Sequence, residues 1–222
     1  VFERVLIKAA ARLNVYLPGP AGSGKTTIAE QVAEALGLPF YAYGAIGMAH
    51  EFEGYMNAQG NYVESMLYRA FKNGGLVLFD EMDASDARAL LRLNAILANK
   101  IAAFPNGEMV KKHPDFVVIG TGNTFGHGAT AQYVGRNPLD GSTLDRYQYI
   151  PMGYDEELER AITGNDLWVD YVQAVRHVVQ DHKMRYIVSP RASINGAILI
   201  AAGDNLDDIK DETIFNKGFN EA

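Results

Sequence analysis

Eight residues near the start of the chain have the types and spacing of a phosphate-binding loop. They read Gly19-Pro20-Ala21-Gly22-Ser23-Gly24-Lys25-Thr26 and match the pattern G-x-x-x-x-G-K-[ST]. Glycines let the backbone curl so that successive N–H groups face phosphate oxygens. Lys25 would bring a cation to the β- and γ-phosphates, and the Thr26 hydroxyl would bind Mg²⁺. We therefore expect residues 19–27, Thr27 included, to bind a nucleotide.

The alternative is a glycine-rich turn with an incidental lysine, and the flanking residues speak against it. Val15-Tyr16-Leu17 is a short apolar run that predicts a buried strand entering the loop. Apolar residues at helical spacing predict a helix from Thr27 to Leu36, and Gly37 is a stop signal. Strand, loop and helix thus occur in the order that a phosphate-binding loop requires.

Two carboxylates follow a second apolar run. Leu76-Val77-Leu78-Phe79 predicts a buried strand, and Asp80 and Glu81 follow it directly. Ligands of open α/β sheets bind at the carboxyl ends of the strands. Asp80 would hold Mg²⁺ there, and Glu81 would orient and polarise an attacking water.

Asp83 and Asn123 each have two readings. A helix N-cap or a solvated acid is favoured for Asp83 over a metal ligand. Asn123 ends the strand region Phe116–Gly120 and its glycine-rich extension, where it could help to place the attacking water. An asparagine beside glycine is also common in turns. Given the other motifs, we favour the catalytic role for Asn123.

Two arginines complete the candidate set. Arg146 lies in Leu-Asp-Arg-Tyr, before an expected strand, and Arg191 lies in Ser-Pro-Arg-Ala, at the start of an expected helix. Arginine is suited to stabilising charge that develops on a transferring phosphoryl group. Either arginine could instead belong to an ordinary surface ion pair.

The remaining pattern predicts alternating strands and helices, followed by helices alone. Several strands are wholly apolar, which indicates a parallel sheet covered on both faces. Beyond Pro151 only helices are expected, so we predict two domains, residues 1–152 and 153–222. The other expected elements are helices at Phe2–Leu13, Tyr62–Phe71, Ala87–Ala103, Asp155–Ile162, Leu167–Asp181, Arg191–Ala202 and Leu206–Lys217, strands at Pro39–Tyr43 and Tyr147–Ile150, and a hairpin within Phe104–Asp115.

Composition restricts the class of protein. The 222 residues are 48% hydrophobic and 21% charged, as in ordinary globular proteins. No apolar run approaches the ~20 residues that span a bilayer. Cysteine is absent, which excludes disulfides and thiolate metal sites and fits a cytoplasmic location. The net charge of −7, without a dense Lys/Arg block, argues against indiscriminate nucleic-acid binding.

The order of these motifs resembles the AAA+ ATPases, most closely the MoxR-like and dynein-related branch with its CbbQ, CobS and McrB types. The resemblance covers roughly residues 5–202. It implies an α/β fold, the P-loop NTPase three-layer αβα sandwich with a parallel sheet, plus a small C-terminal helical lid domain. It also implies ATP and Mg²⁺ as ligands.

The resemblance also implies roles for single residues. Lys25 and Thr26 would be Walker A, Asp80 and Glu81 Walker B, and Asn123 and Arg191 the two sensors. Arg146 resembles the arginine finger that acts on ATP in a neighbouring subunit. Arg136, in Val-Gly-Arg-Asn, is a second candidate for an intersubunit contact.

Two segments resemble accessory elements of this branch. Glu51-Phe52-Glu53-Gly54 with Gly60-Asn61-Tyr62 is similar to an insert that faces the ring pore, and residues 104–115 are similar to its hairpin. Tyr55, after Gly54, is the better candidate to grip a substrate, whereas core packing is at least as expected for Tyr41 and Tyr43.

Two functions follow as hypotheses. The first is a ring ATPase that hydrolyses ATP to remodel or activate a protein partner. The resemblance implies a homo-oligomeric ring, and we expect a hexamer. The second is a nucleic-acid motor subunit, as in McrB-like restriction or phage DNA processing. The acidic composition favours the first. A nucleotide-binding module with little turnover is a blander third option. The presence of Glu81 and a candidate finger counts against it, because binding alone needs neither.

Overall fold

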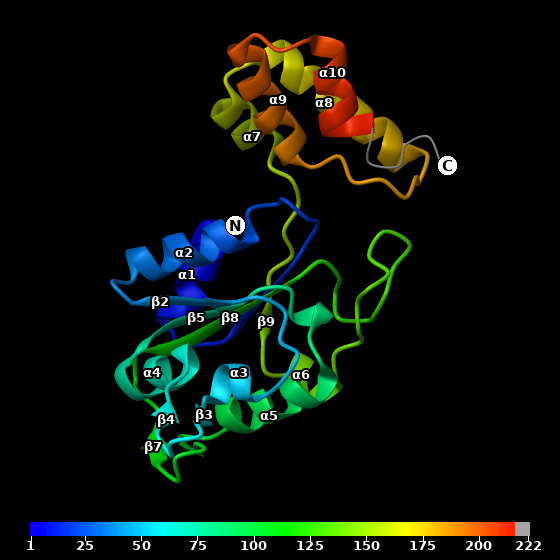
Figure 1. The fold of residues 1–222 in the computed structure, drawn as a ribbon. Helices are drawn as coiled ribbons and strands as arrows, with labels where there is room; N and C mark the ends of the chain where they lie inside the picture. The colour runs from blue at the N-terminus through cyan, green and yellow to red at the C-terminus, as the bar shows by residue number, and fades with distance from the viewer. Residues whose placement is uncertain (216–222) are drawn as a thin grey trace. The chain divides into compact units, whose positions relative to one another are not determined.

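The structure, a computed structural model, describes residues 1–215 (Figure 1). The chain forms two compact units. The first holds residues 1–19 and 24–152, and the second holds residues 20–23 and the chain from 153 onward. The last seven residues, 216–222, lie outside the described part, and with them the end of the predicted helix Leu206–Lys217. Within residues 1–215, no helix has the length and apolar character needed to cross a bilayer.

A five-stranded sheet forms the centre of the first unit, and all its strands are parallel. In spatial order the strands are β2 (Phe40–Tyr43), β5 (Gly75–Phe79), β8 (Phe116–Gly122), β1 (Val15–Pro18) and β9 (Gln148–Tyr149). Val15 and Leu78 both pair with Ile119 of β8, so the three central strands are in lateral register. Their carboxyl ends therefore meet at one edge of the sheet.

Alternate residues of these strands face opposite layers. Leu76 and Leu78 pack with helices α1 (Phe2–Ala10) and α2 (Lys25–Ala35). Val77 and Phe79 pack on the other side with α4 (Met66–Asn73) and α5 (Ala87–Ala98). Figure 1 shows these two pairs of helices on the two sides of the sheet. This confirms the predicted αβα sandwich with a parallel sheet.

Three predicted helices are too long: α1 ends at Ala10 and not at Leu13, and two others differ by more. The predicted helix 62–71 begins only at Met66, where the Ser65 hydroxyl caps it by accepting a hydrogen bond from Tyr68 N. Before it, β3 (Tyr55–Met56) pairs with β4 (Tyr62–Val63). The short helix α3 (His50–Glu53) precedes this pair. The predicted helix 87–103 ends at Ala98, because Asn99 is extended and β6 (Ile101–Ala103) pairs with β7 (Met109–Lys111). Cross-strand pairing outweighs helix propensity in both places.

The second unit contains only helices within its described part. They are α7 (Glu156–Thr163), α8 (Asp166–Asp181), α9 (Pro190–Ala202), α10 (Leu206–Lys210) and the π-helical segment η2 (Asp211–Phe215). Trp168 lies at the centre of its apolar core and covers Gly196 so closely that no side chain fits there. A helical C-terminal region is thus present, as predicted.

Candidate nucleotide-binding site

Three neighbouring strands bring the predicted site residues to one edge of the sheet. The glycine loop follows β1, Asp80 and Glu81 follow β5, and Asn123 follows β8. Gly19 N donates to Gly122 O at 3.0 Å, which continues the β1–β8 ladder into the loop. Because β8 lies between β5 and β1, residues that are a hundred positions apart in sequence become neighbours here.

The loop backbone needs its glycines. Gly24 has φ +83° and precedes Lys25, the first residue of α2. At that φ an L side chain is strained, so the sharp entry into the helix depends on glycine. Gly19 lies so close to Met152 O that a Cβ would collide with it. The first turn of α2 therefore presents its unpaired N–H groups toward the loop.

Four residues of the loop, Pro20 to Ser23, group with the helical unit. Ser23 N donates to Pro20 O at 3.3 Å, which closes the turn, and Tyr154 Oη donates to Ala21 O at 2.9 Å. The Ser23 hydroxyl is buried, and no hydrogen bond satisfies it within the described chain. A buried hydroxyl without a hydrogen-bond partner favours binding of a ligand that forms a hydrogen bond with it.

Lys25 connects the loop to the end of β8. Its Nζ donates to Gly19 O at 2.8 Å and to Asn123 Oδ1 at 3.0 Å, and the residue is 7% exposed. Asn123 Nδ2 in turn lies 3.4 Å from Glu81 Oε1. The structure thus places Lys25, Asn123 and Glu81 in one polar chain.

Thr26 and Asp80 form the second pair. Thr26 Oγ1 donates to Asp80 Oδ2 at 2.8 Å, and the Thr121 hydroxyl donates to the other carboxylate oxygen. Thr121 Oγ1 also accepts from Glu81 N at 3.1 Å. Within residues 1–215 no group of three or more His, Cys, Asp or Glu gathers as a ready metal cage. A hydroxyl and one carboxylate suit Mg²⁺, which usually keeps water and phosphate ligands.

Asp83 has neither of the roles that the sequence favoured. It lies fully buried in the short 3₁₀ helix η1 (Met82–Ala84), and Asp86 is the residue that caps α5. Asp83 Oδ2 accepts from Asn123 N at 2.9 Å and from Thr124 N and Oγ1, both at 2.8 Å. The expectation of a cap or a solvated acid is therefore wrong: Asp83 fixes the segment that presents Asn123.

Two further groups surround Asp83. Arg136 Nη1 lies 3.7 Å from Asp83 Oδ1 and 3.1 Å from Glu81 Oε2. Burial by itself lowers the pKa of Arg136, but the hydrogen bond to Glu81 and the charge of Asp83 raise it overall. Tyr16 donates to Thr124 O at 3.2 Å, and burial followed by the charge of Asp83 raises the pKa of its hydroxyl, so Tyr16 stays neutral.

The other predicted site residues lie elsewhere. Arg146 follows the short helix α6 (Gly141–Leu144) and donates to Ser142 O. No hydrogen bond or ion pair in the described chain joins its side chain to Lys25 or Glu81. Thr27 is an exposed residue of α2. Arg191 is exposed near the start of α9 in the helical unit, where a Cβ on Gly22 would lie 3.8 Å from its Cγ.

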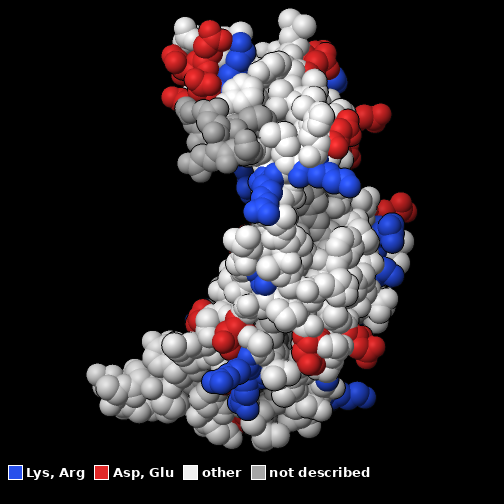
Figure 2. Space-filling model, turned by 90° about the vertical axis from the view of Figure 1, so that its right-hand side faces the viewer, with Lys and Arg blue, Asp and Glu red and all other residues white. Residues whose placement is uncertain are grey.

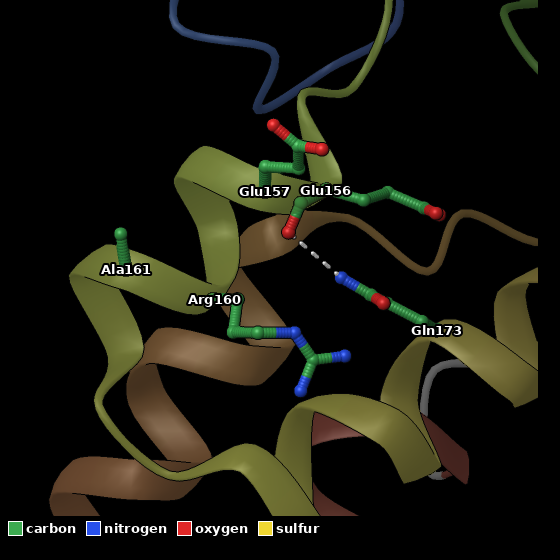
Figure 3. A pocket seen from close by; sticks show the side chains of 5 residues that line it. All are labelled: Glu156, Glu157, Arg160, Ala161 and Gln173. Carbon is green, nitrogen blue, oxygen red and sulfur yellow. Dashed lines mark hydrogen bonds between the residues drawn. The ribbon is translucent and has the colours of Figure 1, made fainter.

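The helical unit has a cavity of its own, of about 420 Å³ (Figure 3). It lies between α7 and α8, and Glu156, Glu157, Arg160, Ala161 and Gln173 line it. Gln173 Nε2 donates to Glu156 O at 3.2 Å, the bond drawn in Figure 3. Arg160 is already paired with Asp166 and Asp170. This cavity offers no unpaired cation for phosphate.

The sequence profile of the AAA domain (dynein-related subfamily) matches residues 14–146. That segment contains the loop, both acidic residues, Asn123 and Arg146. The chain belongs to the dynein-related AAA family.

Similar proteins are known in staphylococci. An uncharacterised protein of Staphylococcus epidermidis is 24% identical over 193 residues, which are 81% of this chain and 71% of that protein. An uncharacterised protein of Staphylococcus aureus is 29% identical over 153 residues, 64% of this chain and 56% of that protein.

Solved structures support the fold of this AAA protein. A candidate ATPase of Cytophaga hutchinsonii has a TM-score of 0.56 at 22% identity and is matched over 73% of this chain, but over only 49% of its own. A RuvB variant of Thermotoga maritima has a TM-score of 0.57 at 14% identity, over 96% of this chain and 65% of its own. At these identities the likeness concerns the fold alone.

Sequence reasoning missed one residue of the AAA site and misread another. Thr121 joins Asp80 to the backbone of Glu81, and Asp83 supports Asn123. For Thr121 a signal existed, because a hydroxyl in an otherwise apolar strand end must find a partner. For Asp83 no local signal existed, since its partners Asn123 and Thr124 follow β8, about forty positions away.

Proposed function

We propose that this chain is an ATPase that assembles into a ring, hydrolyses ATP with Mg²⁺ at subunit interfaces, and remodels or activates a protein partner. One observation carries the proposal: Lys25, Asn123 and Glu81 form a continuous polar chain beside the Thr26–Asp80 pair. We assign residues 1–152 to nucleotide binding and residues 153–222 to a lid.

The residues present fit a nucleotide with Mg²⁺. The loop supplies backbone donors, the buried Ser23 hydroxyl without a hydrogen-bond partner, and the cation of Lys25. Thr26 and Asp80 supply the oxygen ligands that Mg²⁺ prefers. Together they match a polyphosphate better than an uncharged ligand, because each group is a cation, a donor or a metal ligand.

The proposed roles follow from this geometry. Lys25 neutralises phosphate charge, and its bond to Asn123 keeps that side chain turned toward the loop. Glu81 accepts the hydrogen bond of the attacking water, and Asn123, in contact with Glu81, fixes where that water lies. Bound Mg²⁺ would neutralise charge on the β- and γ-phosphates.

The two arginines are proposed to act from outside this cluster. Arg146 would reach the nucleotide of the adjacent subunit, and Arg191 would contact it from the lid. The position of Arg146 away from its own chain's Lys25 and Glu81 supports a role in trans. Loss of the γ-phosphate would then remove contacts of Arg191 in the lid and of Arg146 in the adjacent subunit. The lid and the adjacent subunit would change position, which converts hydrolysis into motion.

A protein client is favoured over nucleic acid. On the face drawn in Figure 2, lysine and arginine form small groups among acidic and uncharged residues and no continuous basic stripe. Tyr55 of β3 is 48% exposed, whereas Tyr43 is buried in the core. An exposed aromatic beside the β3–β4 turn suits a grip on an extended peptide.

Glu81→Gln tests the proposal. Gln keeps the size of the side chain and removes the charge that polarises water, so kcat should fall at least about 100-fold while binding of Mg·ATP is retained. Calorimetry measures binding and phosphate release measures turnover. Glu34→Gln, on the exposed face of α2, is the matched control and should change neither.

The same variant serves as a substrate trap. With ATP bound and turnover blocked, the Glu81→Gln ring should retain its client during a pull-down. Wild-type turnover that rises with DNA and not with the captured protein would replace the protein-client function with the nucleic-acid one. Absence of Mg·ATP binding by the wild type would reject both.

A further inference from the structure

Arg136 is a largely buried cation in an exposed segment. Its side chain is 13% exposed, although Val134, two positions earlier, is 79% exposed. Arg136 Nη1 donates to Glu81 Oε2 at 3.1 Å and lies 3.7 Å from Asp83 Oδ1. Burying a cation in a loop is costly unless it is paired, and here two carboxylates of the same chain pair with it.

The residue beside Arg136 is anchored to the backbone of the segment that carries Asp83. Asn137 N donates to Asp83 O at 2.6 Å, and Asn137 Nδ2 donates to Ser85 O at 3.0 Å. Leu139 N donates to Gly126 O at 2.9 Å, which closes the base of the loop. The position of Arg136 is therefore fixed relative to η1 and does not depend on its side chain alone.

Glu81 needs such a partner. Its backbone is left-handed, with φ 54° and ψ 43°, and its side chain is 49% exposed. Asn123 Nδ2 is 3.4 Å from one carboxylate oxygen, near the limit for a hydrogen bond, whereas Arg136 holds the other at 3.1 Å. A charge-assisted bond of this kind restricts a carboxylate more than a long neutral one does.

Asp83 needs Arg136 as well. Its Oδ1 is buried and makes no hydrogen bond within the described chain, and Arg136 is the cation beside it. Withdrawing Arg136 toward another subunit would leave the buried Asp83 charge with hydrogen bonds on Oδ2 alone and no cation beside Oδ1. This argues against the intersubunit role that the sequence suggested as a second possibility for Arg136.

We propose that Arg136 is a positioning residue for its own subunit: it holds the Glu81 carboxylate in place, with Asp83 as the fixed counter-charge. The inference rests on the proposed ATPase function and deepens it. Arg136 acts on the attacking water only through Glu81. It is assigned no contact with the nucleotide of the neighbouring subunit.

The first experiment compares Arg136→Met with Arg136→Lys. Met keeps much of the length and no charge, so kcat should fall about 10- to 100-fold with KM for ATP within about twofold. Lys keeps the charge, so the decrease in log kcat for Arg136→Lys should be smaller than that for Arg136→Met by at least about a third. If Met leaves kcat unchanged, or Lys recovers nothing although it folds and binds Mg·ADP, the proposal is wrong.

A second variant guards against loss of folding. Asp83→Asn combined with Arg136→Met removes both buried charges and should fold, because no unpaired ion remains. It should bind Mg·ADP like the wild type and turn over as slowly as Arg136→Met alone. Turnover at the wild-type rate would show that Glu81 needs no positioning by Arg136.

Subunit mixing separates a role in cis from a role in trans. Arg136→Met subunits are mixed with Lys25→Ala subunits, and native mass spectrometry of size-tagged chains verifies that mixed rings form. A residue acting in cis gives no recovery, because each intact phosphate loop belongs to a subunit that lacks Arg136. Recovery would overturn the inference while leaving the ATPase function standing, whereas an inactive wild type would reject the function itself.

Discussion

At the scale of single residues, one buried carboxylate holds two segments of the candidate site together. Asp83 accepts three hydrogen bonds from Asn123 and Thr124, and its carbonyl oxygen accepts from Asn137 N. Both the residue that bonds Lys25 and the loop that carries Arg136 are thereby fixed to η1. A fully buried acid with this many partners is costly to replace, since both Thr124 donors left behind are buried and the Asn123 N–H is partly buried.

Asp83→Ala should therefore be far more destabilising than removal of a surface cap. It leaves three donors without their acceptor and removes one of the two carboxylates beside Arg136, and we expect a loss of about 3–5 kcal/mol in the free energy of unfolding. Asp86→Ala, the matched control at the N-cap of α5, should cost about 1 kcal/mol. Urea unfolding measures both, and equal losses would contradict the structural role of Asp83.

At the scale of elements, the helical unit is held by a buried ion pair as well as by its apolar core. Glu159 of α7 and Arg176 of α8 are joined by two bonds of 2.7 Å, and both side chains are at most 2% exposed. Ser193 of α9 also donates to Glu159, and the Arg176 guanidinium lies 4.7 Å from the centre of the Tyr154 ring. Three helices and the start of the unit thus share one polar centre.

The stability of this unit should depend on pH through Glu159. Burial by itself raises the pKa of Glu159, but the hydrogen bonds from Arg176 and Ser193 outweigh it, so the pKa is lowered on folding. A lowered pKa contributes stability above the unfolded value, near 4.3, and that stability is lost as the pH falls through the folded value. The unfolding midpoint should therefore fall as the solution is acidified below about pH 5.

Trp168, the chain's only tryptophan, lies in this unit, so its fluorescence follows the transition there. In Glu159→Gln the titrating group is gone, and the slope of the midpoint against pH should be shallower than in the wild type. Parallel slopes in the two proteins would assign the acid sensitivity to other carboxylates.

At the scale of the whole molecule, we propose that a second copy of the chain completes the active centre. Arg146 lies within the matched AAA segment, yet within its own chain it donates to Ser142 O and not to the cluster around Lys25. An arginine supplied by a neighbour makes turnover depend on assembly. Specific activity should then rise with protein concentration until rings are complete.

Arg146→Ala should lower kcat about 10³-fold or more, with binding of Mg·ADP unchanged, because a finger stabilises the transition state and not the bound nucleotide. Mixing these subunits with Lys25→Ala subunits should restore part of the turnover, since each defect then lies on a different chain. Failure to recover in verified mixed rings would place the finger elsewhere.

The sequence by itself determined the phosphate loop, the acids after β5, the αβα fold and the helical C-terminal region. Those features are local: glycine spacing, short wholly apolar runs and amphipathic helices are each recognisable within a few residues. Only the tertiary structure decided the roles of Asp83, Thr121 and Arg136 and the ends of two helices. The partners of those three residues lie about forty to fifty-five positions away and meet them because β8 is inserted beside β5, an order that no local pattern encodes.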